Sequence, residues 1–324
     1  MLAKDKATVQ KHRKKARQLI REITKREGFK ITERIKFGPR YFVAKGLYQG
    51  NECIFKICLY PQSYDHLTNE KFSREIIFLD FIQHSKYHSL AKTTPALLKS
   101  NTKTRAWYIR ELLDQQPQNI NGGNIRFKDS FFNTKNLNWF VDTFIKELHK
   151  VKKPELPSAF KKLLFPPQTL EYMWRFISPY KKQLERFTAH KGSLKKIHKI
   201  FKQNSLIYRR SPRVLAHQEV YSPHILIKGS EIKMIDWENV GWATLTHDVV
   251  TLWMRAYHHP RWQQKLKKAF FEKNRKVKNL KKLWETTVLL QSTFNVISYH
   301  FYDEKKDFLP LAKASKKIIN DYLK

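Results

Sequence analysis

Hydrophobic and polar residues alternate along much of the segment from residue 29 to residue 60, with the period of two that is typical of half-buried β-strands. Gly, Pro and Asn residues interrupt this alternation twice, and such residues favour tight turns. A fourth segment of the same kind follows near residue 110. The first part of the chain is therefore expected to form a small antiparallel sheet, with strands over residues 29–35, 41–47, 52–59 and 107–113.

Apolar residues recur every three or four positions through most of the remaining chain, which is the period of an α-helix buried on one face. The first 28 residues show this pattern weakly, and a stronger helix is expected over residues 69–83. The later helical patterns cover residues 137–151, 168–190, 193–209, 243–258, 260–282, 284–302 and 308–323. Together these patterns predict an α+β fold with a small β-rich part and a larger helical part.

The leading helix carries ten Lys and Arg residues around a sparse apolar stripe of Val9, Leu19, Ile20 and Ile23. In one interpretation this stripe packs against the predicted sheet, and the basic residues lie in solvent. In the other, the basic face holds the helix on an anionic surface, although the stripe is too sparse for strong insertion into a membrane. The sequence leaves both interpretations open.

The composition indicates that the chain can bury a large core, and it bears on where in the cell the protein is expected. With 324 residues, of which 41% are hydrophobic and 14% aromatic, the chain can form one bilobal unit or two domains. No apolar run approaches the roughly 20 residues that a membrane span needs, and the first residues carry no signal-peptide core, so a cytoplasmic protein is expected. Cys53 and Cys58 are too few for a zinc site and are expected to be reduced thiols.

The formal net charge of +36 creates a positive field that attracts an anionic surface, nucleic acid or anionic substrates. Lysine is spread through every segment, however, so the charge is also explained as a property of overall composition. The sequence contains no zinc-finger pattern, RNP-like aromatic motif or coiled-coil heptad that would support a nucleic-acid-binding module.

The chemistry is concentrated between residues 214 and 257. A polar loop opens at His217 after an apolar run, and a second apolar strand ends in Ile-Asp236-Trp-Glu. This arrangement places two acidic residues, Glu219 and Asp236, at adjacent strand ends, where a metal-bound phosphate chain can be held. The pattern therefore indicates phosphoryl transfer.

The same stretch resembles the aminoglycoside phosphotransferase and choline kinase group, in which a loop H-G-D-x-x-x-x-N is followed by a strand end I-D-[WF]-E. The loop of this chain is H-Q-E-x-x-x-x-H. The resemblance assigns four positions: the leading His is His217, the catalytic Asp is replaced by Glu219, the metal-binding Asn is replaced by His224, and the second metal-binding Asp is Asp236. Tyr221 and His224 also echo the loop H-x-D-x-Y-x-x-H of the lipopolysaccharide-core heptose kinases.

Two of these four positions are substituted. A neutral imidazole at His224 can ligate a divalent ion, although Mg²⁺ prefers oxygen. At Glu219 the carboxylate is one methylene longer, and a displacement of about 1 Å can reduce a rate on the order of 100-fold. The chain can therefore be an active kinase or a catalytically degenerate pseudokinase that binds nucleotide.

The resemblance implies a bilobal, protein-kinase-like α+β fold, and we divide the chain accordingly. A basic N-terminal helix over residues 1–28 precedes a β-rich N-lobe and hinge over residues 29–115. A helical C-lobe with the catalytic loop and acceptor region covers residues 116–324. The nucleotide is expected to be ATP, with Mg²⁺ or Mn²⁺.

By the same resemblance, Lys56 in Cys-Ile-Phe-Lys56-Ile-Cys is the nucleotide lysine. The alternative is a surface lysine whose ammonium reaches solvent, because burial of an isolated ammonium is costly. Glu75 and Glu70 compete as its partner, and Glu75 is preferred because it lies nearer the apolar stripe of its helix. The remaining expected nucleotide contacts are Arg40 and Val43 around a glycine-poor phosphate turn, and Ile109, Glu111 and Leu112 at the hinge.

Three candidate functions, each of a different class, are consistent with the sequence. The first is an ATP-dependent phosphotransferase that acts on a hydroxyl of a small molecule, sugar or glycan, with Glu219 orienting the acceptor. The second is a nucleotide-binding pseudokinase, and the third is a protein that binds anionic polymers through its charge. The region after residue 255, which would form much of the acceptor pocket, has few acidic residues, and this argues against a polycationic acceptor.

Overall fold

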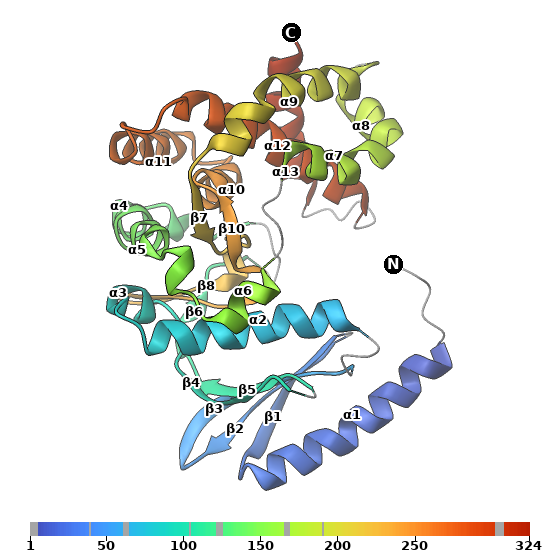
Figure 1. Cartoon of the computed structure of the whole chain (residues 1–324), viewed down its shortest axis with the longest axis vertical. Coiled ribbons are helices and arrows are strands. Elements are labelled where there is room, and N and C mark those ends of the chain that lie inside the picture. Colours follow the sequence, from blue (N-terminus) through green and yellow to red (C-terminus); the bar gives the residue numbers. More distant parts are fainter. Residues whose placement is uncertain are drawn as a thin grey trace. The chain divides into compact units, whose positions relative to one another are not determined.

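A computed structural model describes residues 6–38, 40–60, 65–103, 105–120, 126–164, 169–189, 191–301 and 308–324. The chain forms two compact units, labelled by element in Figure 1. The first unit contains Met1–Gln115 and two later segments, Leu156–Leu164 and Glu231–Val240. The second contains Gln116–Glu155, Phe165–Ser230 and Gly241–Lys324. Among the residues just given, no helix is long and apolar enough to cross a membrane.

The first unit is built on an antiparallel five-stranded sheet with the order β1-β2-β3-β5-β4. The two left-handed residues Gln49 and Gly50, with φ of 51° and 81°, form the tight turn between β2 and β3. Strands β1, β2, β3 and β5 confirm the four predicted strands to within two residues at each end, and β4 was not predicted. The strands are β1 (Lys30–Phe37), β2 (Tyr41–Tyr48), β3 (Asn51–Cys58), β4 (Leu97–Asn101) and β5 (Trp107–Glu111).

Helices α1 (Lys6–Arg26) and α2 (His66–Gln83) cover opposite faces of this sheet (Figure 1). Successive residues of a strand point to opposite faces. Phe55 of the central strand β3 therefore packs in the cluster that α1 covers, and the next residue, Lys56, faces α2. Because both faces of β3 are covered, its buried residues form a continuous run rather than an alternation.

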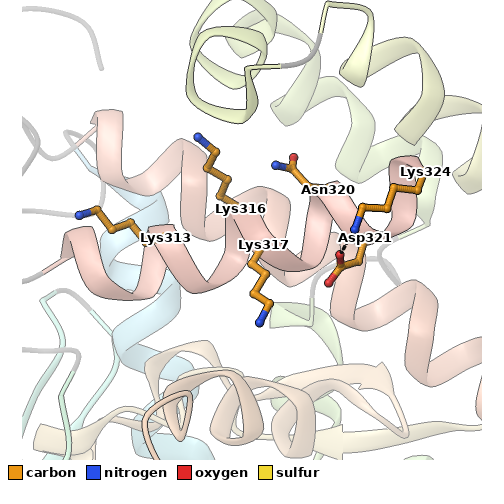
Figure 2. Close-up of a pocket in the computed structure, with 6 residues that line it drawn as sticks. All are labelled: Lys313, Lys316, Lys317, Asn320, Asp321 and Lys324. Atoms are coloured by element: carbon orange, nitrogen blue, oxygen red, sulfur yellow. Dashed lines mark hydrogen bonds and ion pairs between the residues drawn. The ribbon is translucent and has the colours of Figure 1, made fainter.

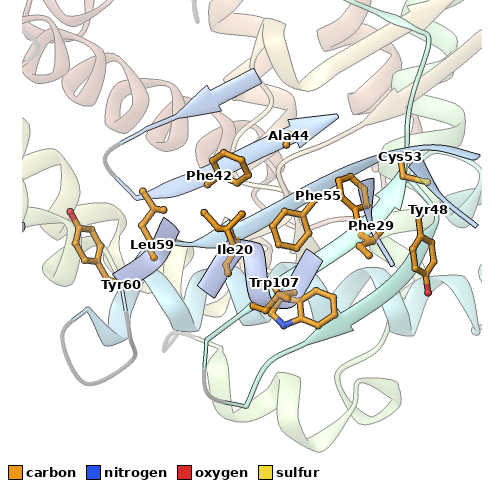
Figure 3. Close-up of a cluster of buried hydrophobic side chains, with 14 residues drawn as sticks. Ile20, Phe29, Phe42, Ala44, Tyr48, Cys53, Phe55, Leu59, Tyr60 and Trp107 are labelled. Atoms are coloured by element: carbon orange, nitrogen blue, oxygen red, sulfur yellow. The ribbon is translucent and has the colours of Figure 1, made fainter. Parts of the chain in front are cut away.

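The cluster on the α1 side contains Ala16, Ile20 and Ile23 of the helix, packed against aromatic side chains of the sheet such as Phe55 and Trp107 (Figure 3). Burial of these residues stabilises α1 on the sheet by the hydrophobic effect. Of the two interpretations of the leading helix, the structure supports packing against the sheet. Cys53, in the same cluster, and Cys58 are free buried thiols, as the sequence predicted.

The two later segments of the first unit pack beside α2. Phe78 of α2 lies between Phe160 of α6 (Ser158–Leu163) and Trp237, at ring-centroid distances of 6.0 and 4.6 Å. The backbone N–H of Met234, at the end of β9 (Glu231–Met234), donates to the carbonyl of Thr93 at 2.7 Å. That carbonyl follows the short helix α3 (His88–Ala91). These contacts bring the strand end that carries Asp236 into the first unit.

The second unit is mainly helical, with two short antiparallel strand pairs. Strand β6 (Gln116–Pro117) pairs with β8 (Ile225–Lys228), and β7 (Arg213–Ala216) pairs with β10 (Gly241–Thr244). A second hydrophobic cluster is shared by α7, α8, α9, α12 and α13. The helices are α4 (Thr134–Asn138), α5 (Lys146–Lys150), α7 (Leu170–Ile177), α8 (Lys181–Thr188), α9 (Ser193–Arg210), α10 (His247–Arg255), α11 (Pro260–Lys273), α12 (Leu280–Phe301) and α13 (Leu309–Leu323).

Some predicted helices differ in the structure. The helix expected over residues 168–190 is divided into α7 and α8 by a short 3₁₀ helix, η4 (Ser178–Tyr180). The helix expected over residues 243–258 begins only at His247, because residues 241–244 form β10 and pair with β7. The helix expected over residues 260–282 ends at Lys273, and α12 begins at Leu280. Asn279 adopts φ of 57° between them, which a continuous right-handed helix excludes. The helix predicted over residues 137–151 is present, with a π-helical segment, η2 (Trp139–Ile145), inside it.

Candidate active site

Lys56 forms a buried ionic group in the first unit. Its Nζ lies 2.9 Å from Oε2 of Glu75 on α2 and 3.2 Å from Oδ1 of Asp236. Burial acts to lower the pKa of Lys56, but the nearby negative charges of Glu75 and Asp236 outweigh it and hold the pKa well above its usual range. Lys56 is therefore a charged, paired lysine rather than a surface lysine, and its buried partner is Glu75, not Glu70.

Three aromatic rings surround the ammonium of Lys56. Its Nζ lies 4.8 Å from the ring centroid of Tyr41, 5.0 Å from that of Phe72 and 5.9 Å from that of Tyr108. Such cation–π contacts stabilise the positive charge and exclude water from it. The hydrophobic pattern of the sequence does not indicate these ring contacts. The strand register could have identified Tyr108, because Tyr108 and Val43 are the cross-strand partners of Lys56.

The segment from Asp236 to Glu238 is a tight turn with acidic residues on both sides of a buried tryptophan. Asp236 adopts a left-handed conformation, with φ of 66°, which is uncommon for a residue with a side chain and is typical of functional sites. The Trp237 Nε1–H donates to the carbonyl of Met234 at 2.9 Å and holds the turn. Glu238 accepts a 2.6 Å hydrogen bond from the hydroxyl of Tyr41.

The other predicted nucleotide residues lie in different surroundings. Val43 is on the same face of the sheet as Lys56, whereas Ile109 lies on the α1 face, within the cluster of Figure 3. Arg40 has an exposed side chain, and its carbonyl accepts from the N–H of Leu59 at 2.8 Å. Pro39 of the predicted phosphate turn lies outside the described residues.

At the predicted hinge, two backbone donors, those of Glu111 and Leu112, are used within the first unit. The N–H of Glu111 donates to the carbonyl of Ala96 at 2.9 Å, and the N–H of Leu112 donates to the carbonyl of Glu52 at 3.3 Å. The carboxylate of Glu111 accepts from the N–H of Ala96 at 2.9 Å and from Nζ of Lys233 at 3.3 Å. Contact of Glu111 and Leu112 with an adenine stays a prediction.

In the second unit, Asp248 anchors the loop that begins at His217. Its two carboxylate oxygens accept the backbone N–H groups of His217 at 2.7 Å and Gln218 at 2.9 Å. Gln218 is left-handed, with φ of 68°, so the two N–H groups can point at one carboxylate. Burial raises the pKa of Asp248 to about 6, although the two N–H groups act to lower it. Asp248 lies in the first turn of α10, shortly after β10.

The ring of His217 is fully buried and is part of the loop itself. The backbone N–H of Glu219 donates to Nδ1 of His217 at 3.2 Å, so Nδ1 is the acceptor and the ring proton is on Nε2. The ring lies 6.5 Å from that of Phe144 in η2. His217 therefore fixes the backbone from which the carboxylate of Glu219 projects. A direct catalytic role for either residue stays a prediction.

His224 is oriented by the same loop. Its Nδ1 lies 3.0 Å from the carbonyl oxygen of Glu219, and because a carbonyl can only accept, Nδ1 carries the proton. The lone pair is then on Nε2, which is the ring nitrogen suited to metal ligation. The carbonyl of Glu219 also accepts the N–H of Tyr221 at 2.8 Å. The guanidinium of Arg255 lies 4.5 Å from the Tyr221 ring centroid and supports the far side of the loop.

The donor chemistry of the predicted metal ligands suits different ions. The carboxylate of Asp236 is the kind of hard oxygen donor that Mg²⁺ prefers. An imidazole such as His224 suits transition ions better than Mg²⁺. Asp236 belongs to the first unit and His224 to the second, so their shared ligation of one ion stays a prediction.

A pocket of about 440 Å³ lies along the polar face of α13 and contains none of the predicted site residues (Figure 2). Its lining residues are Lys313, Lys316, Lys317, Asn320, Asp321 and Lys324. Lys324 is paired with Asp321 at 3.0 Å, and the other lysines extend from the helix. A row of lysines along one helix is the expected pattern for a solvated face.

Solved structures share this fold. The macrolide 2'-phosphotransferase of Brachybacterium faecium is 14% identical, with 92% of this chain and 96% of that chain covered and a TM-score of 0.57. The choline kinase of Streptococcus pneumoniae is 10% identical, with 94% and 99% covered and a TM-score of 0.60. A spectinomycin phosphotransferase, solved with ADP and spectinomycin, is 14% identical, with 94% and 97% covered and a TM-score of 0.55.

At these identities the structural likeness concerns the fold, and it confirms the predicted α+β, kinase-like class. No curated protein sequence matches this chain. Residues 143–278 match the model of the phosphotransferase enzyme family (APH), and this segment contains the loop from His217 to His224 and the strand end at Asp236. The resemblance of this chain to the aminoglycoside phosphotransferase and choline kinase group, expected from its loop residues, is confirmed by the family match and the shared fold.

Proposed function

We propose that this protein is an ATP-dependent phosphotransferase that transfers the γ-phosphate to a hydroxyl of a small molecule, sugar or glycan. The observation that carries the proposal is the ionic group of Lys56, Glu75 and Asp236, with Nζ at 2.9 and 3.2 Å from the two carboxylates. Burial of the charged side chains of Lys56 and Glu75 is costly, and such an arrangement is typical of sites where charge is used. The family match over residues 143–278 supports the same reaction class.

In this proposal, each side chain of the first unit that contacts or lies near Lys56 has one role. Lys56 binds and orients phosphate oxygens, and Glu75 fixes the position of the Lys56 ammonium through their hydrogen bond. Asp236, whose side chain is 31% exposed, presents its carboxylate to a divalent ion. When bound, that ion neutralises the negative charge that develops on the phosphate oxygens. Tyr41 and Phe72 limit the access of water to Lys56.

In the second unit, Glu219 orients the acceptor hydroxyl and accepts its proton as the phosphoryl group is transferred. Asp248 and His217 are positioning residues, because they fix the backbone on either side of Gln218 through the contacts given above. The loop is thus held at three points before a substrate binds, and preorganisation of this kind supports catalysis.

A pseudokinase is the second candidate, and the residues that favour it are Glu219 and His224, which replace an Asp and an Asn of the family pattern. Under this alternative the buried Lys56 group still binds nucleotide, but the phosphate is not transferred. Both candidates predict binding of ATP, and they differ in turnover.

Thermal-shift titration with ATP and either Mg²⁺ or Mn²⁺ tests the part that both candidates share. We expect both nucleotide–metal complexes to raise the melting temperature, with Mn²⁺ more effective because His224 is an imidazole ligand. Asp236→Asn should remove the metal-dependent part of the shift and leave the unliganded melting temperature close to that of the wild type. An unchanged metal-dependent shift in Asp236→Asn would contradict the assignment of this residue.

A panel of alcohols, sugars and glycans in a coupled ADP-release assay then identifies the acceptor class. We expect neutral or anionic alcohols to stimulate release more than polycationic aminoglycosides, because the region after residue 255 has few acidic residues to bind amines. Stimulation by aminoglycosides alone would contradict this choice of acceptor without affecting the proposed reaction type.

A further inference from the structure

A second group of metal-ligating side chains lies in the helical unit and takes no part in the proposed reaction. Asp129 begins the short 3₁₀ helix η1 (Asp129–Phe131), and His258 and His259 lie between α10 and α11. More than 120 residues of sequence separate the aspartate from the histidines, so the fold brings these groups together. One ligand atom from each of the three side chains lies within 4.8 Å of the other two.

Two of the three distances within this group match the edges of a metal tetrahedron, and the third, between the two imidazoles, is at most 4.8 Å. Nε2 of His259 lies 3.2 Å from Oδ1 of Asp129, and Nε2 of His258 lies 3.5 Å from the same oxygen. Zinc–nitrogen and zinc–oxygen bonds of about 2.0 to 2.1 Å place neighbouring tetrahedral ligands roughly 3.3 to 3.4 Å apart. Little movement of these side chains is therefore needed to surround an ion.

We propose that Asp129, His258 and His259 bind one divalent transition-metal ion of the zinc class, at a site additional to the metal of the proposed phosphoryl transfer. Two imidazole nitrogens and one carboxylate oxygen are a ligand set that zinc proteins use, whereas Mg²⁺ takes mainly oxygen ligands. Three protein ligands leave a fourth coordination position for water, because tetrahedral Zn²⁺ takes four ligands.

Neighbouring aromatic residues hold both imidazoles in place. The ring of Phe132 stacks on His259 with centroids 4.1 Å apart and meets His258 edge to face at 5.2 Å. The Nε1–H of Trp262 donates to the carbonyl of Asn133 at 3.1 Å, which fixes the segment after η1 to α11. A ligand set that is positioned before the ion arrives loses less conformational entropy on binding.

The surroundings shift the pKa of two of these groups in the direction that favours ligation. Burial lowers the pKa of His258, which favours the neutral, ligating imidazole. A hydrogen bond from His259 lowers the pKa of Asp129, which favours the carboxylate. The nearby guanidinium of Arg126 acts against a cation, so the ion must be held by ligand bonds rather than by the local field.

The ion would link η1, which carries Asp129, to the segment between α10 and α11, which carries His258 and His259. The helix that contains η2 follows η1 in the chain and would be held with it. A ligand that binds only the folded protein stabilises it in proportion to its affinity and concentration. Zn²⁺ and Co²⁺ should therefore raise the melting temperature of the nucleotide-free protein, and Mg²⁺ should not do so through this site.

The test is a titration of the nucleotide-free, full-length protein with Co²⁺, followed by the visible absorption of tetrahedral cobalt. The variants are Asp129→Asn and His259→Gln, which remove one ligand each at exposed or partly exposed positions. Asp80→Asn and His84→Gln are the matched controls, because this Asp–His pair at the C-terminal end of α2 is exposed and its Oδ1 and Nδ1 atoms are 3.6 Å apart. Asp236→Asn separates this site from the proposed nucleotide metal.

We expect one tetrahedral Co²⁺ per chain, displaced by Zn²⁺, in the wild type, in Asp236→Asn and in both controls. Asp129→Asn and His259→Gln should each weaken its affinity by at least about tenfold, as the loss of a metal-supporting group usually does. Absence of the tetrahedral spectrum in the wild type, or equal affinity in Asp129→Asn and the wild type, would overturn the proposal. Loss of the spectrum in Asp236→Asn alone would assign the cobalt to the nucleotide site instead.

Discussion

At the scale of single residues, the ammonium of Lys56 pairs with the carboxylates of Glu75 and Asp236. Removal of one partner from a buried ion pair leaves an unpaired charge, which lowers stability by about 3 to 5 kcal/mol. Lys56→Met should therefore reduce the free energy of unfolding by about this amount, because Glu75 is 2% exposed and is left without its counter-charge. Urea unfolding followed by circular dichroism gives this value.

Glu75→Gln and the double variant Lys56→Met/Glu75→Gln complete the comparison. The double variant should be more stable than the sum of the two single changes predicts, with a coupling energy of about 0.5 to 3 kcal/mol. Additive effects would show that the pair at 2.9 Å contributes no mutual stabilisation.

Asp248 gives a pH-dependent stability whose direction follows from its surroundings. Its pKa in the folded protein is about 6, above the unfolded value of about 3.9. Between these two values the folded protein binds more protons than the unfolded protein, so this group's contribution to stability falls as the pH rises from about 4 to about 6. Relative to Asp248→Asn, the wild type should lose stability over that window and show no further relative loss above it.

Thermal unfolding of both proteins at a series of pH values measures this difference, and the titrations of all other groups cancel in the comparison. A difference that stays constant between about pH 4 and pH 6, or that grows in favour of the wild type, would show that the two backbone N–H groups dominate the burial of Asp248.

The resemblance to the family's motifs was enough to select Lys56, Glu75 and Asp236, which the structure brings together in one ionic group. The resemblance was not enough to find Tyr41 or Tyr108, which surround Lys56 only because of strand register and the position of α2. Contacts of this kind arise between residues far apart in the sequence, and no local pattern specifies them.

At the scale of elements, the packing of β1 on β2 depends on Gly46. A Cβ atom at this position would overlap the carbonyl oxygen of Lys30 and the ring of Phe29. Gly46→Ala should therefore separate the two strands and lower the free energy of unfolding by about 1 to 3 kcal/mol, the usual range for overpacking. Denaturant unfolding of the full chain checks this value.

Gly50→Asn is the matched control in the same hairpin. Gly50 has φ of 81° and nothing within 4 Å of an added Cβ, and Asn tolerates left-handed conformations better than most residues. Its effect should be smaller than that of Gly46→Ala. An equal or larger loss in Gly50→Asn would show that backbone strain, rather than overlap with Lys30 and Phe29, limits glycine replacement here.

The periodicity of hydrophobic residues predicted which helices and strands are present better than it predicted where they end. The alternation over residues 29–59 predicted all three strands, and β2 shows the matching alternation of fully and partly buried residues. Strand β10 was missed because its four residues are held by pairing with β7, which lies about 30 residues earlier in the sequence. The end of α11 was missed because the conformation of Asn279 is not visible in the hydrophobic pattern.

At the scale of the whole molecule, the net charge of +36 predicts binding to polyanions that depends strongly on salt. If the charge is only compositional, the affinity for a DNA duplex should fall by roughly 10³-fold or more as salt rises from 50 to 200 mM. The affinity should also be the same for duplexes of different sequence. Stabilisation by ATP and a divalent ion should persist at the higher salt, because the Lys56 group is buried and weakly screened.

Fluorescence anisotropy with labelled duplexes of unrelated sequence, and thermal shift with ATP in the same buffers, measure the two effects side by side. Duplex binding that survives 200 mM salt and differs between sequences would contradict the compositional explanation and indicate a dedicated nucleic-acid site.

Turnover of labelled ATP by the wild type and by Glu219→Ala tests the proposed function most directly. An active phosphotransferase should transfer the γ-phosphate to an alcohol acceptor, and Glu219→Ala should lower kcat by about 100-fold or more with nearly unchanged nucleotide affinity, since an orienting base acts mainly in the transition state. Glu219→Asp should retain or raise activity. If the wild type binds ATP yet transfers no phosphate with any divalent ion, and activity appears only in Glu219→Asp combined with His224→Asn, the protein is a pseudokinase and the proposed reaction is wrong.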